Sequence, residues 1–169
     1  MDTVRRSSLS TARLQSVEPV VDTSGPLLVR AEHVPLVSSA RLQVVDVTDD
    51  VMARVRALGV REGTATLQSL HTTCAVCINE SQDALVTDFV TFLESVVDPD
   101  AQWRHDDPVY SDCDRRNTDS HLRALVLSPC VTLQVSGGEL VLCRWQRVLI
   151  VELDGPRART LRLQVMGVL

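Results

Sequence analysis

The chain has 169 residues, of which 44% are hydrophobic, and this is enough for one domain with a sizeable core. Its formal net charge of −5 argues against binding to duplex nucleic acid, and its 3% of aromatic residues leave little surface for stacking single-stranded bases. All 17 basic residues are arginines, which excludes a lysine nucleophile and leaves Arg, His or backbone N–H groups to hold an anion.

Residues 1–30 carry scattered serines, prolines and charges without an apolar period, so we expect a flexible N-terminal extension before a domain over 31–169. No apolar leader follows Arg5 and Arg6, and no run approaches the ~18 apolar residues that cross a membrane. Five cysteines are an odd number for a disulfide framework. We expect a cytoplasmic protein with reduced thiols and no membrane partner.

The first half of the domain alternates short strands and helices. A strand is predicted over 41–47, followed by an amphipathic helix that Thr48 caps and Gly59 ends. One strand is predicted from about 64 to 78 on its alternating side chains. A longer helix is predicted over about 81–97, and Asp98-Pro99 ends it.

The second half contains one short helix and then strands. The helix is predicted over 118–127, and a strand follows from Val131. Gly137-Gly138 predicts a hairpin turn into a long apolar strand over about 139–153. A last strand follows the turn at Asp154-Gly155-Pro156. Strands separated by two or three helices, with hairpins at the end, favour an α+β fold over a doubly wound parallel sheet.

A segment without helical or strand period joins the second and third predicted helices over 98–117. It is longer than most connections in a compact domain, and loops of this length are usually functional or disordered. Trp103 and Tyr110 favour an ordered loop that forms a site.

Three of the four histidines lie beside loops or element ends with other polar groups. His71 is the last residue of the alternating pattern at the start of the strand predicted over 64–78. His105 lies in the long loop, and His121 follows Asn117 and Asp119. Three neutral imidazoles would hold a divalent metal and leave a position open for water or substrate. The spacing alone does not bring them together, and unrelated histidines are the default interpretation.

Several other residues admit two interpretations. Cys74 and Cys77 have the spacing of a redox or zinc motif, but residues three apart in a strand face opposite ways, which favours small buried side chains. Glu80 suits either a helix-capping acid or a general base. Arg157 suits either a surface charge or an anion clamp.

Four segments, taken in order, resemble the signature motifs of the YjbQ-like UPF0047 family. They are HTTCAVCINE over 71–80, Arg104-His105, NTDSHLRA over 117–124 and RWQRVLIVELDGPRART over 144–160. The resemblance covers about residues 40–169. Thr73 and Cys74 depart from the common pattern, and Arg115-Arg116 stand where acidic or small residues are common, which changes the local charge.

The resemblance implies a compact α+β domain with a β-sandwich core, two or three helices and assembly into a homotrimer. It also implies an enzyme on a small phosphorylated metabolite, with a weak thiamine-phosphate synthase activity. Such a transferase joins hydroxymethylpyrimidine diphosphate to thiazole phosphate and releases diphosphate.

The same resemblance suggests roles for individual residues. The expected catalytic residues are His71, Glu80, His105 and His121, with the three histidines as ligands of a divalent metal, Zn or Mg. The expected substrate- and phosphate-binding residues are Asn79, Asn117, Trp145, Gln146 and Arg157. Thr72 and Asp119 are expected to orient these side chains.

Two alternatives remain open at this stage. A metal on three imidazoles would activate water for phosphoester hydrolysis, with Glu80 as the base. The other alternative is a trimeric module that binds phosphate or metal without catalysis.

Overall fold

The structure is a computed structural model, and it describes residues 21–169. Most of the expected N-terminal extension therefore lies outside the described residues. Strand β1 (Leu28–Val37) begins within the last three residues of the extension expected over 1–30, and no strand was predicted there. Its inward-facing Val34 and Leu36 are separated by Pro35, which obscures the alternation.

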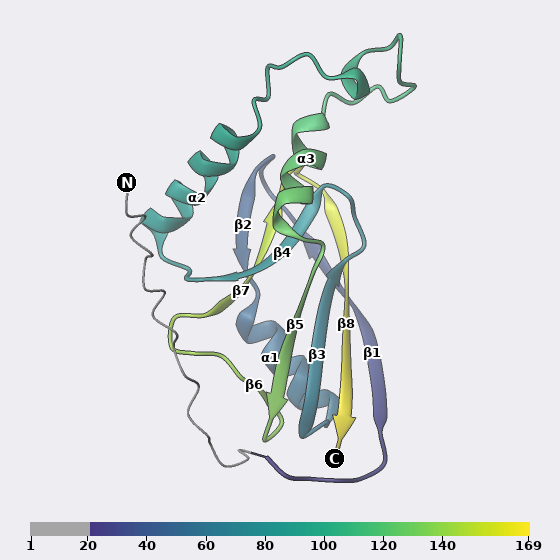
Figure 1. The fold of residues 1–169 in the computed structure, drawn as a ribbon, viewed down its shortest axis with the longest axis vertical. Helices are drawn as coiled ribbons and strands as arrows, with labels where there is room; N and C mark the ends of the chain where they lie inside the picture. Colours follow the sequence, from purple (N-terminus) through teal and green to yellow (C-terminus); the bar gives the residue numbers. More distant parts are fainter. Residues whose placement is uncertain (1–20) are drawn as a thin grey trace, which may run out of the picture.

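Residues 21–169 form two antiparallel sheets (Figure 1). The larger sheet has the order β1-β8-β3-β5-β6. Its other strands are β8 (Ala158–Val168), β3 (Glu62–Ser69), β5 (Cys130–Ser136) and β6 (Glu139–Leu140). The smaller sheet has the order β2-β7-β4, with β2 (Gln43–Asp46), β7 (Arg147–Glu152) and β4 (Cys74–Asn79).

In the described part of the chain three α-helices accompany the sheets, which confirms the α+β fold. They are α1 (Thr48–Leu58), α2 (Asp83–Val96) and α3 (Thr118–Leu127), and a 3₁₀ turn, η1 (Arg104–Asp106), lies between the last two. In residues 21–169 no helix is long and apolar enough to span a bilayer.

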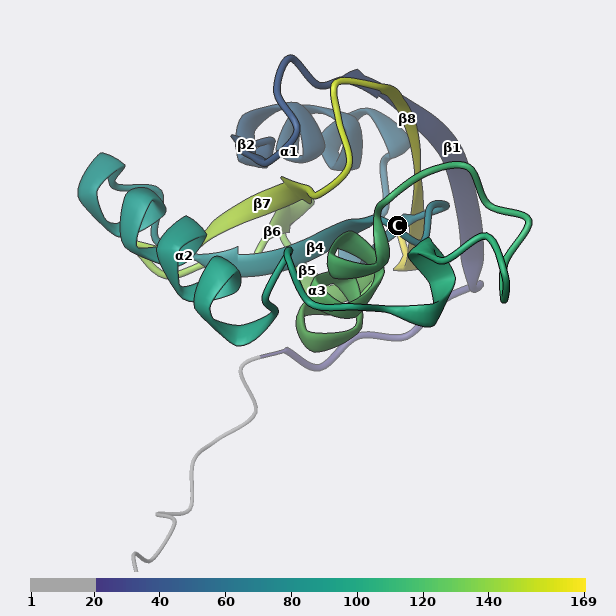
Figure 2. The same ribbon diagram turned by 90° about the horizontal axis from the view of Figure 1, so that it is seen from above.

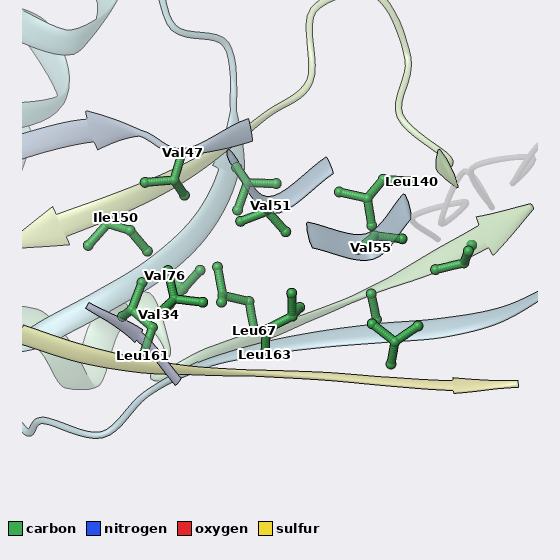
Figure 3. Close-up of a cluster of buried hydrophobic side chains, with 14 of the residues drawn as sticks. Val34, Val47, Val51, Val55, Leu67, Val76, Leu140, Ile150, Leu161 and Leu163 are labelled. Carbon is green, nitrogen blue, oxygen red and sulfur yellow. The ribbon is translucent and has the colours of Figure 1, made fainter. Parts of the chain in front are cut away.

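The main core lies between the two sheets and α1 (Figure 3). Figure 3 labels Leu67, Leu161 and Leu163 from the larger sheet facing Val76 and Ile150 from the smaller one. All five are buried, so the β-sandwich core rests on aliphatic side chains, as the scarcity of aromatic residues requires.

A second apolar cluster covers the other face of the smaller sheet. Ala75 and Val151 pack there against Leu93 of α2 and Ala124 of α3. Figure 2 shows α1 and α3 on opposite sides of β7 and β4. Because β7 is covered on both faces, its sequence is a continuous apolar run rather than an alternating one.

The single strand predicted over 64–78 is wrong, because β3 and β4 belong to different sheets. The chain turns a corner at residues 70–73, where Leu70 N–H donates to Thr160 O at 3.1 Å. The first half of the predicted strand pairs in the larger sheet as β3, and the second half pairs in the smaller sheet as β4. His71 therefore lies in the corner instead of inside a strand.

The long strand predicted over 139–153 is wrong for the same reason. β6 pairs with β5 in the larger sheet and β7 pairs with β2 and β4 in the smaller one. Between them Gln146 folds back on Cys143: its N–H donates to Cys143 O at 3.0 Å, and its Oε1 accepts the Cys143 N–H at 2.9 Å.

The helices were predicted closely. The helix over 118–127 has the predicted bounds, and Gly59 has the positive φ of 74° expected where a helix ends. Thr48, the predicted cap of the first helix, is instead its first residue, and Val47 holds the cap position. Cys74 is buried in the main core and Cys77 packs against the second cluster, so the two thiols lie on opposite faces as predicted. Burial raises the pKa of both thiols.

Candidate functional site

The candidate site lies at one end of the smaller sheet, where Cys74 and Glu152 are paired. His71 precedes this end of β4, and Asp154 and Arg157 follow this end of β7. The turn after β7 is therefore brought beside the corner that holds His71.

A buried ion pair fixes this turn. Glu152 is fully buried; its Oε2 accepts from Arg159 Nε at 2.6 Å and its Oε1 from Arg159 Nη2. Burial raises the pKa of Glu152, but the hydrogen bonds from Arg159 and from the Asp154 N–H outweigh it and leave the pKa lowered. Arg159 Nη2 also donates to Thr73 Oγ1 at 3.0 Å, which joins the turn to the corner.

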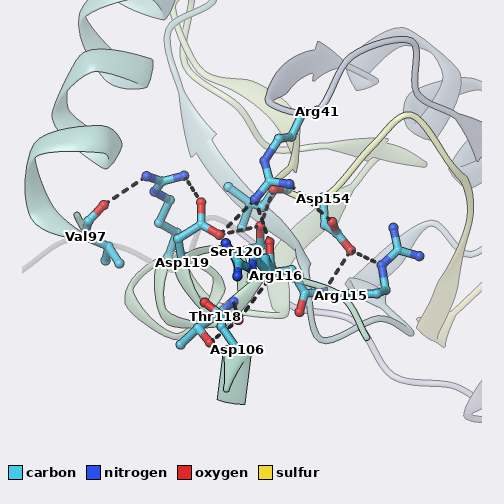
Figure 4. Close-up of polar contacts among 12 residues, drawn as sticks. Arg41, Val97, Asp106, Arg115, Arg116, Thr118, Asp119, Ser120 and Asp154 are labelled. Atoms are coloured by element: carbon cyan, nitrogen blue, oxygen red, sulfur yellow. Dashed lines mark hydrogen bonds and ion pairs between the residues drawn. The ribbon is translucent and has the colours of Figure 1, made fainter. Parts of the chain in front are cut away.

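Asp154 belongs to a group of polar contacts in Figure 4, where it is labelled beside Arg115 and Arg41. Its buried Oδ2 accepts from Asn117 Nδ2 at 3.0 Å and from Arg157 Nη1 at 2.8 Å. Arg115 Nε lies 3.6 Å from the same oxygen, and Arg41 Nη1 lies 4.0 Å from Oδ1. Four side chains from three segments of the sequence thus converge on one carboxylate.

Asp119 extends the group into α3. Its Oδ2 pairs with Arg123 Nη1 at 2.7 Å, and its Oδ1 accepts from Arg41 Nη2 at 3.0 Å. Arg123 is buried and also donates to Leu93 O and Val97 O, the carbonyl oxygens at the end of α2. Asp119 therefore orients Arg41 and Arg123, and its expected role of orienting the histidines stays a prediction.

We call these side chains the Asp154 cluster; its ionised members are Arg41, Arg115, Arg123, Arg157, Asp119 and Asp154. Four guanidinium groups face two carboxylates, which leaves an excess of two positive charges. The side chains of Arg41, Arg115 and Arg157 are 53%, 46% and 35% exposed. Their remaining N–H donors are accessible to an anion.

Asp106 brings two of the three histidines together. Its Oδ1 accepts the N–H groups of Asn117 and Thr118, both at 3.1 Å, and the Thr118 hydroxyl at 2.7 Å. This ties η1 to the start of α3 and sets the rings of His105 and His121 perpendicular, with centroids 5.1 Å apart.

His71 is held separately in the corner. Its Nε2 accepts the Thr160 N–H at 2.7 Å, which places the ring proton of the neutral form on Nδ1. Burial and then the charge of Arg159 lower the pKa of His71, and burial and then His105 lower the pKa of His121. Both imidazoles are therefore neutral at pH 7.

The remaining predicted residues lie at the other end of the smaller sheet. Asn79 pairs with Arg147 there, at the opposite end of β4 from Cys74, and about 17 Å separates the two ends. Asn79 Oδ1 accepts the Glu80 N–H at 2.9 Å, and Trp145 is 57% exposed. Within one chain Asn79, Glu80, Trp145 and Gln146 do not join the histidines.

Thr72 is exposed in the His71 corner. Arg41, Asp106 and Asp154 were not among the predicted site residues. Asp154 was interpreted only as part of a turn, and Arg41 only as part of a strand. These residues are marked by an excess of arginine over carboxylate. That excess is visible only after folding has brought the side chains together.

The fold and the cluster define a class: a small α+β protein with an arginine- and histidine-containing site at the end of a sheet. The chain belongs to the UPF0047 YjbQ-like family, whose model matches residues 32–168.

Relatives and solved structures agree with this family. The chain is 36% identical over 139 residues to a UPF0047 protein from Methanothermobacter thermautotrophicus, covering 82% of this chain and 93% of that one. It is 30% identical to the UPF0047 protein YugU from Bacillus subtilis, covering 77% and 94%. Its fold is similar to that of a YbjQ-like protein of unknown function from Sulfolobus solfataricus, with a TM-score of 0.78, 28% identity and coverage of 83% and 99%.

Proposed function

We propose that the protein is a small enzyme that acts on a phosphorylated metabolite and holds the phosphate at the Asp154 cluster. The observation that carries the proposal is the excess of two positive charges on partly exposed arginines. Planar guanidinium groups bind phosphate oxygens in pairs, and a rigid cluster does so without first reorganising.

The reaction we propose is a thiamine-phosphate synthase-type transfer. The C–O bond of hydroxymethylpyrimidine diphosphate breaks, and its electron pair leaves with the diphosphate. The lone pair of the thiazole nitrogen then forms the new C–N bond to the pyrimidinylmethyl carbon. Arg41, Arg115 and Arg157 would stabilise the departing charge, and the nearby histidines would supply or accept protons.

The arginines provide the first test. Arg41→Gln and Arg157→Gln each remove one positive charge from the cluster, so we expect the affinity for inorganic diphosphate to fall about tenfold or more. Calorimetric titration measures this, with Arg162→Gln, exposed on β8, as the matched control. Unchanged affinity in both cluster variants contradicts the proposal.

The same variants separate the possible reactions. Incubation with hydroxymethylpyrimidine diphosphate and thiazole phosphate should yield thiamine phosphate, and Arg157→Gln should slow it. Release of inorganic phosphate from phosphoesters without coupling would assign a hydrolase instead. Binding without turnover would assign a binding module.

A divalent metal, Zn or Mg, remains part of the proposal, with His105 and His121 as its ligands. Their rings lie 5.1 Å apart, whereas Nε2 of His71 is already engaged by the Thr160 N–H. In residues 21–169 no three His, Cys, Asp or Glu side chains are arranged as a metal site. We therefore assign no reaction step to a metal.

Elemental analysis of protein purified without chelator tests the metal. We expect about one equivalent in the wild type and less in a His105→Ala, His121→Ala double variant, because these rings would supply two of its ligands. His33→Ala is the control, since His33 is exposed on β1. Equal metal content in all three proteins would remove these histidines as ligands.

We also propose a homotrimer in the cytoplasm. The odd number of cysteines supports the compartment. The surface of α2 supports the assembly, because Leu93 is its one buried residue while Phe92 and Val96 are 54% and 45% exposed.

A further inference from the structure

A cavity of about 720 Å³ opens in the segment between α2 and α3. Figure 1 shows this segment standing at one end of the molecule, next to α3. The volume lies within the range of small-molecule sites. None of Arg41, Arg115, Arg157 and Asp154 lines the cavity, so we treat it as a place distinct from the Asp154 cluster.

Two aromatic residues line this cavity, Trp103 and Tyr110. The indole N–H of Trp103 donates to Asp98 O at 3.2 Å, which fixes the orientation of the ring. Tyr110 is 65% exposed, and the guanidinium carbon of Arg104 lies 5.4 Å from the centroid of its ring. Aromatic rings of this kind gain free energy when another ring packs on them. The aromatic residues therefore favour a ligand with a ring.

Charged residues of both signs line the same cavity. They are Arg104 and Arg116, with Asp100, Asp106 and Asp107. Within residues 21–169 no ion pair joins either arginine to any of these carboxylates. The cavity thus presents positive and negative groups that do not neutralise each other by direct contact.

Other contacts keep these charges apart. The Arg104 guanidinium lies over the Tyr110 ring. Asp107 Oδ1 accepts the Val109 N–H at 2.8 Å, and Asp106 Oδ1 accepts the Thr118 hydroxyl at 2.7 Å. Opposite charges that the fold holds in separate positions are preorganised for a ligand that carries both charges itself.

A free α-amino acid is such a ligand. Its carboxylate can accept two N–H groups from a guanidinium, and its ammonium group can donate to carboxylate oxygens. An amine, an organic acid or one end of a peptide supplies only one of the two charges. Because the lining has three carboxylates and two guanidinium groups, it also disfavours a purely anionic ligand such as phosphate.

We infer that the cavity between α2 and α3 is a binding site for a free α-amino acid with an aromatic side chain. The two arginines of the lining hold its carboxylate, Asp100 and Asp107 hold its ammonium group, and the two aromatic residues pack against its ring. The inference does not rest on the proposed function, because it uses none of the arginines assigned to phosphate.

The test compares three probes by calorimetric titration of the full chain. They are L-phenylalanine, 2-phenylethylamine, which lacks the carboxylate, and 3-phenylpropanoate, which lacks the ammonium group. L-Phenylalanine should bind about tenfold or more tightly than either analogue, because each analogue loses one charge-assisted contact. Equal affinities for the three probes, or no binding of L-phenylalanine, overturn the inference.

Two variants assign the charges. Arg116→Gln should lower the affinity for L-phenylalanine about tenfold and leave that for 2-phenylethylamine unchanged. Asp107→Asn keeps an acceptor for the Val109 N–H and should lower the affinity for L-phenylalanine without weakening 3-phenylpropanoate. Asp112→Asn, exposed in the same segment but outside the lining, is the matched control. An affinity for L-phenylalanine that survives in both variants contradicts the inference.

Trp103 reports where the probe binds. The chain has two tryptophans, so in a Trp145→Phe background Trp103 is the one fluorescent indole. L-Phenylalanine should shift its emission to shorter wavelength, because the probe displaces water from the ring. Binding without this shift places the probe elsewhere and overturns the inference.

The two proposals fail in different ways. Arg157→Gln should weaken the binding of diphosphate and leave the affinity for L-phenylalanine unchanged, since Arg157 does not line the cavity. Loss of the preference for L-phenylalanine with intact diphosphate binding removes the amino-acid site alone. Absence of diphosphate binding with an intact preference removes the phosphate site alone.

Discussion

His71 and His121 have lowered pKa values because each ring is partly withdrawn from water, and positive neighbours add to the effect. The unfolded chain regains the ordinary value of 6.5, so near that pH the unfolded state binds more protons than the folded one. Stability therefore rises with pH through this window and falls on acidification.

We predict a lower melting temperature at pH 5.5 than at pH 7.5, measured by circular dichroism. His71→Asn combined with His121→Asn should flatten this dependence between pH 5.5 and 7.5, because the protons responsible are removed. Glu152 acts only at lower pH: its lowered pKa means that its contribution is lost as pH falls below the ordinary value of 4.5. His33→Asn, at an exposed position on β1, should leave the slope as it is.

At the scale of elements, α3 depends on a residue from outside itself. Its cap position, Asn117, makes no side-chain capping bond, and Asp106 takes that role from the preceding loop. The hydrogen bonds from Thr118 outweigh the burial of Asp106 and lower its pKa, so it is ionised at neutral pH, as suits the positive end of a helix dipole.

Asp106→Ala should destabilise the fold by about 1 kcal/mol, the usual cost of losing a helix cap. Urea unfolding measures the free energy of unfolding of both proteins. Asp112→Ala, at an exposed position in the same loop, is the control, and equal behaviour of both variants would contradict this role.

Elements defined by local signals were predictable, and those defined by distant partners were not. The end of α1 and the bounds of α3 follow from apolar spacing and from their stop signals. The residue at which one apolar run divides between two sheets depends on the strands that lie beside it. The break at His71 and the turn before Arg147 therefore could not be read from the sequence.

The candidate site shows the same division. Motif order predicted His71, His105 and His121 in one site; the rings of His105 and His121 lie 5.1 Å apart, whereas His71 is held by the Thr160 N–H in the corner. Arg41 carries no local signal, because its role depends on carboxylates 78 and 113 residues further along the chain, at Asp119 and Asp154.

At the scale of the whole molecule, the predicted site residues fall at two ends of the smaller sheet. The segment 79–102 carries acidic residues and no basic residue, and the end of α2 within it contacts Arg123 of the Asp154 cluster. Head-to-tail contact between copies closes into a ring when the rotation fits.

We predict a solution mass of three times the 18.6 kDa of one chain, measured by light scattering after size exclusion. Phe92→Asp should shift the mass towards one chain, because it places a charge on the exposed apolar surface of α2. Val29→Asp is the matched control, since Val29 is 56% exposed on β1 against 54% for Phe92.

A wild-type mass of one chain would contradict the trimer, and a trimer insensitive to Phe92→Asp would place the contact away from α2. If the trimer forms through α2, Glu80 and Trp145 of one copy can reach the Asp154 cluster of the next, and Phe92→Asp should then lower activity together with mass.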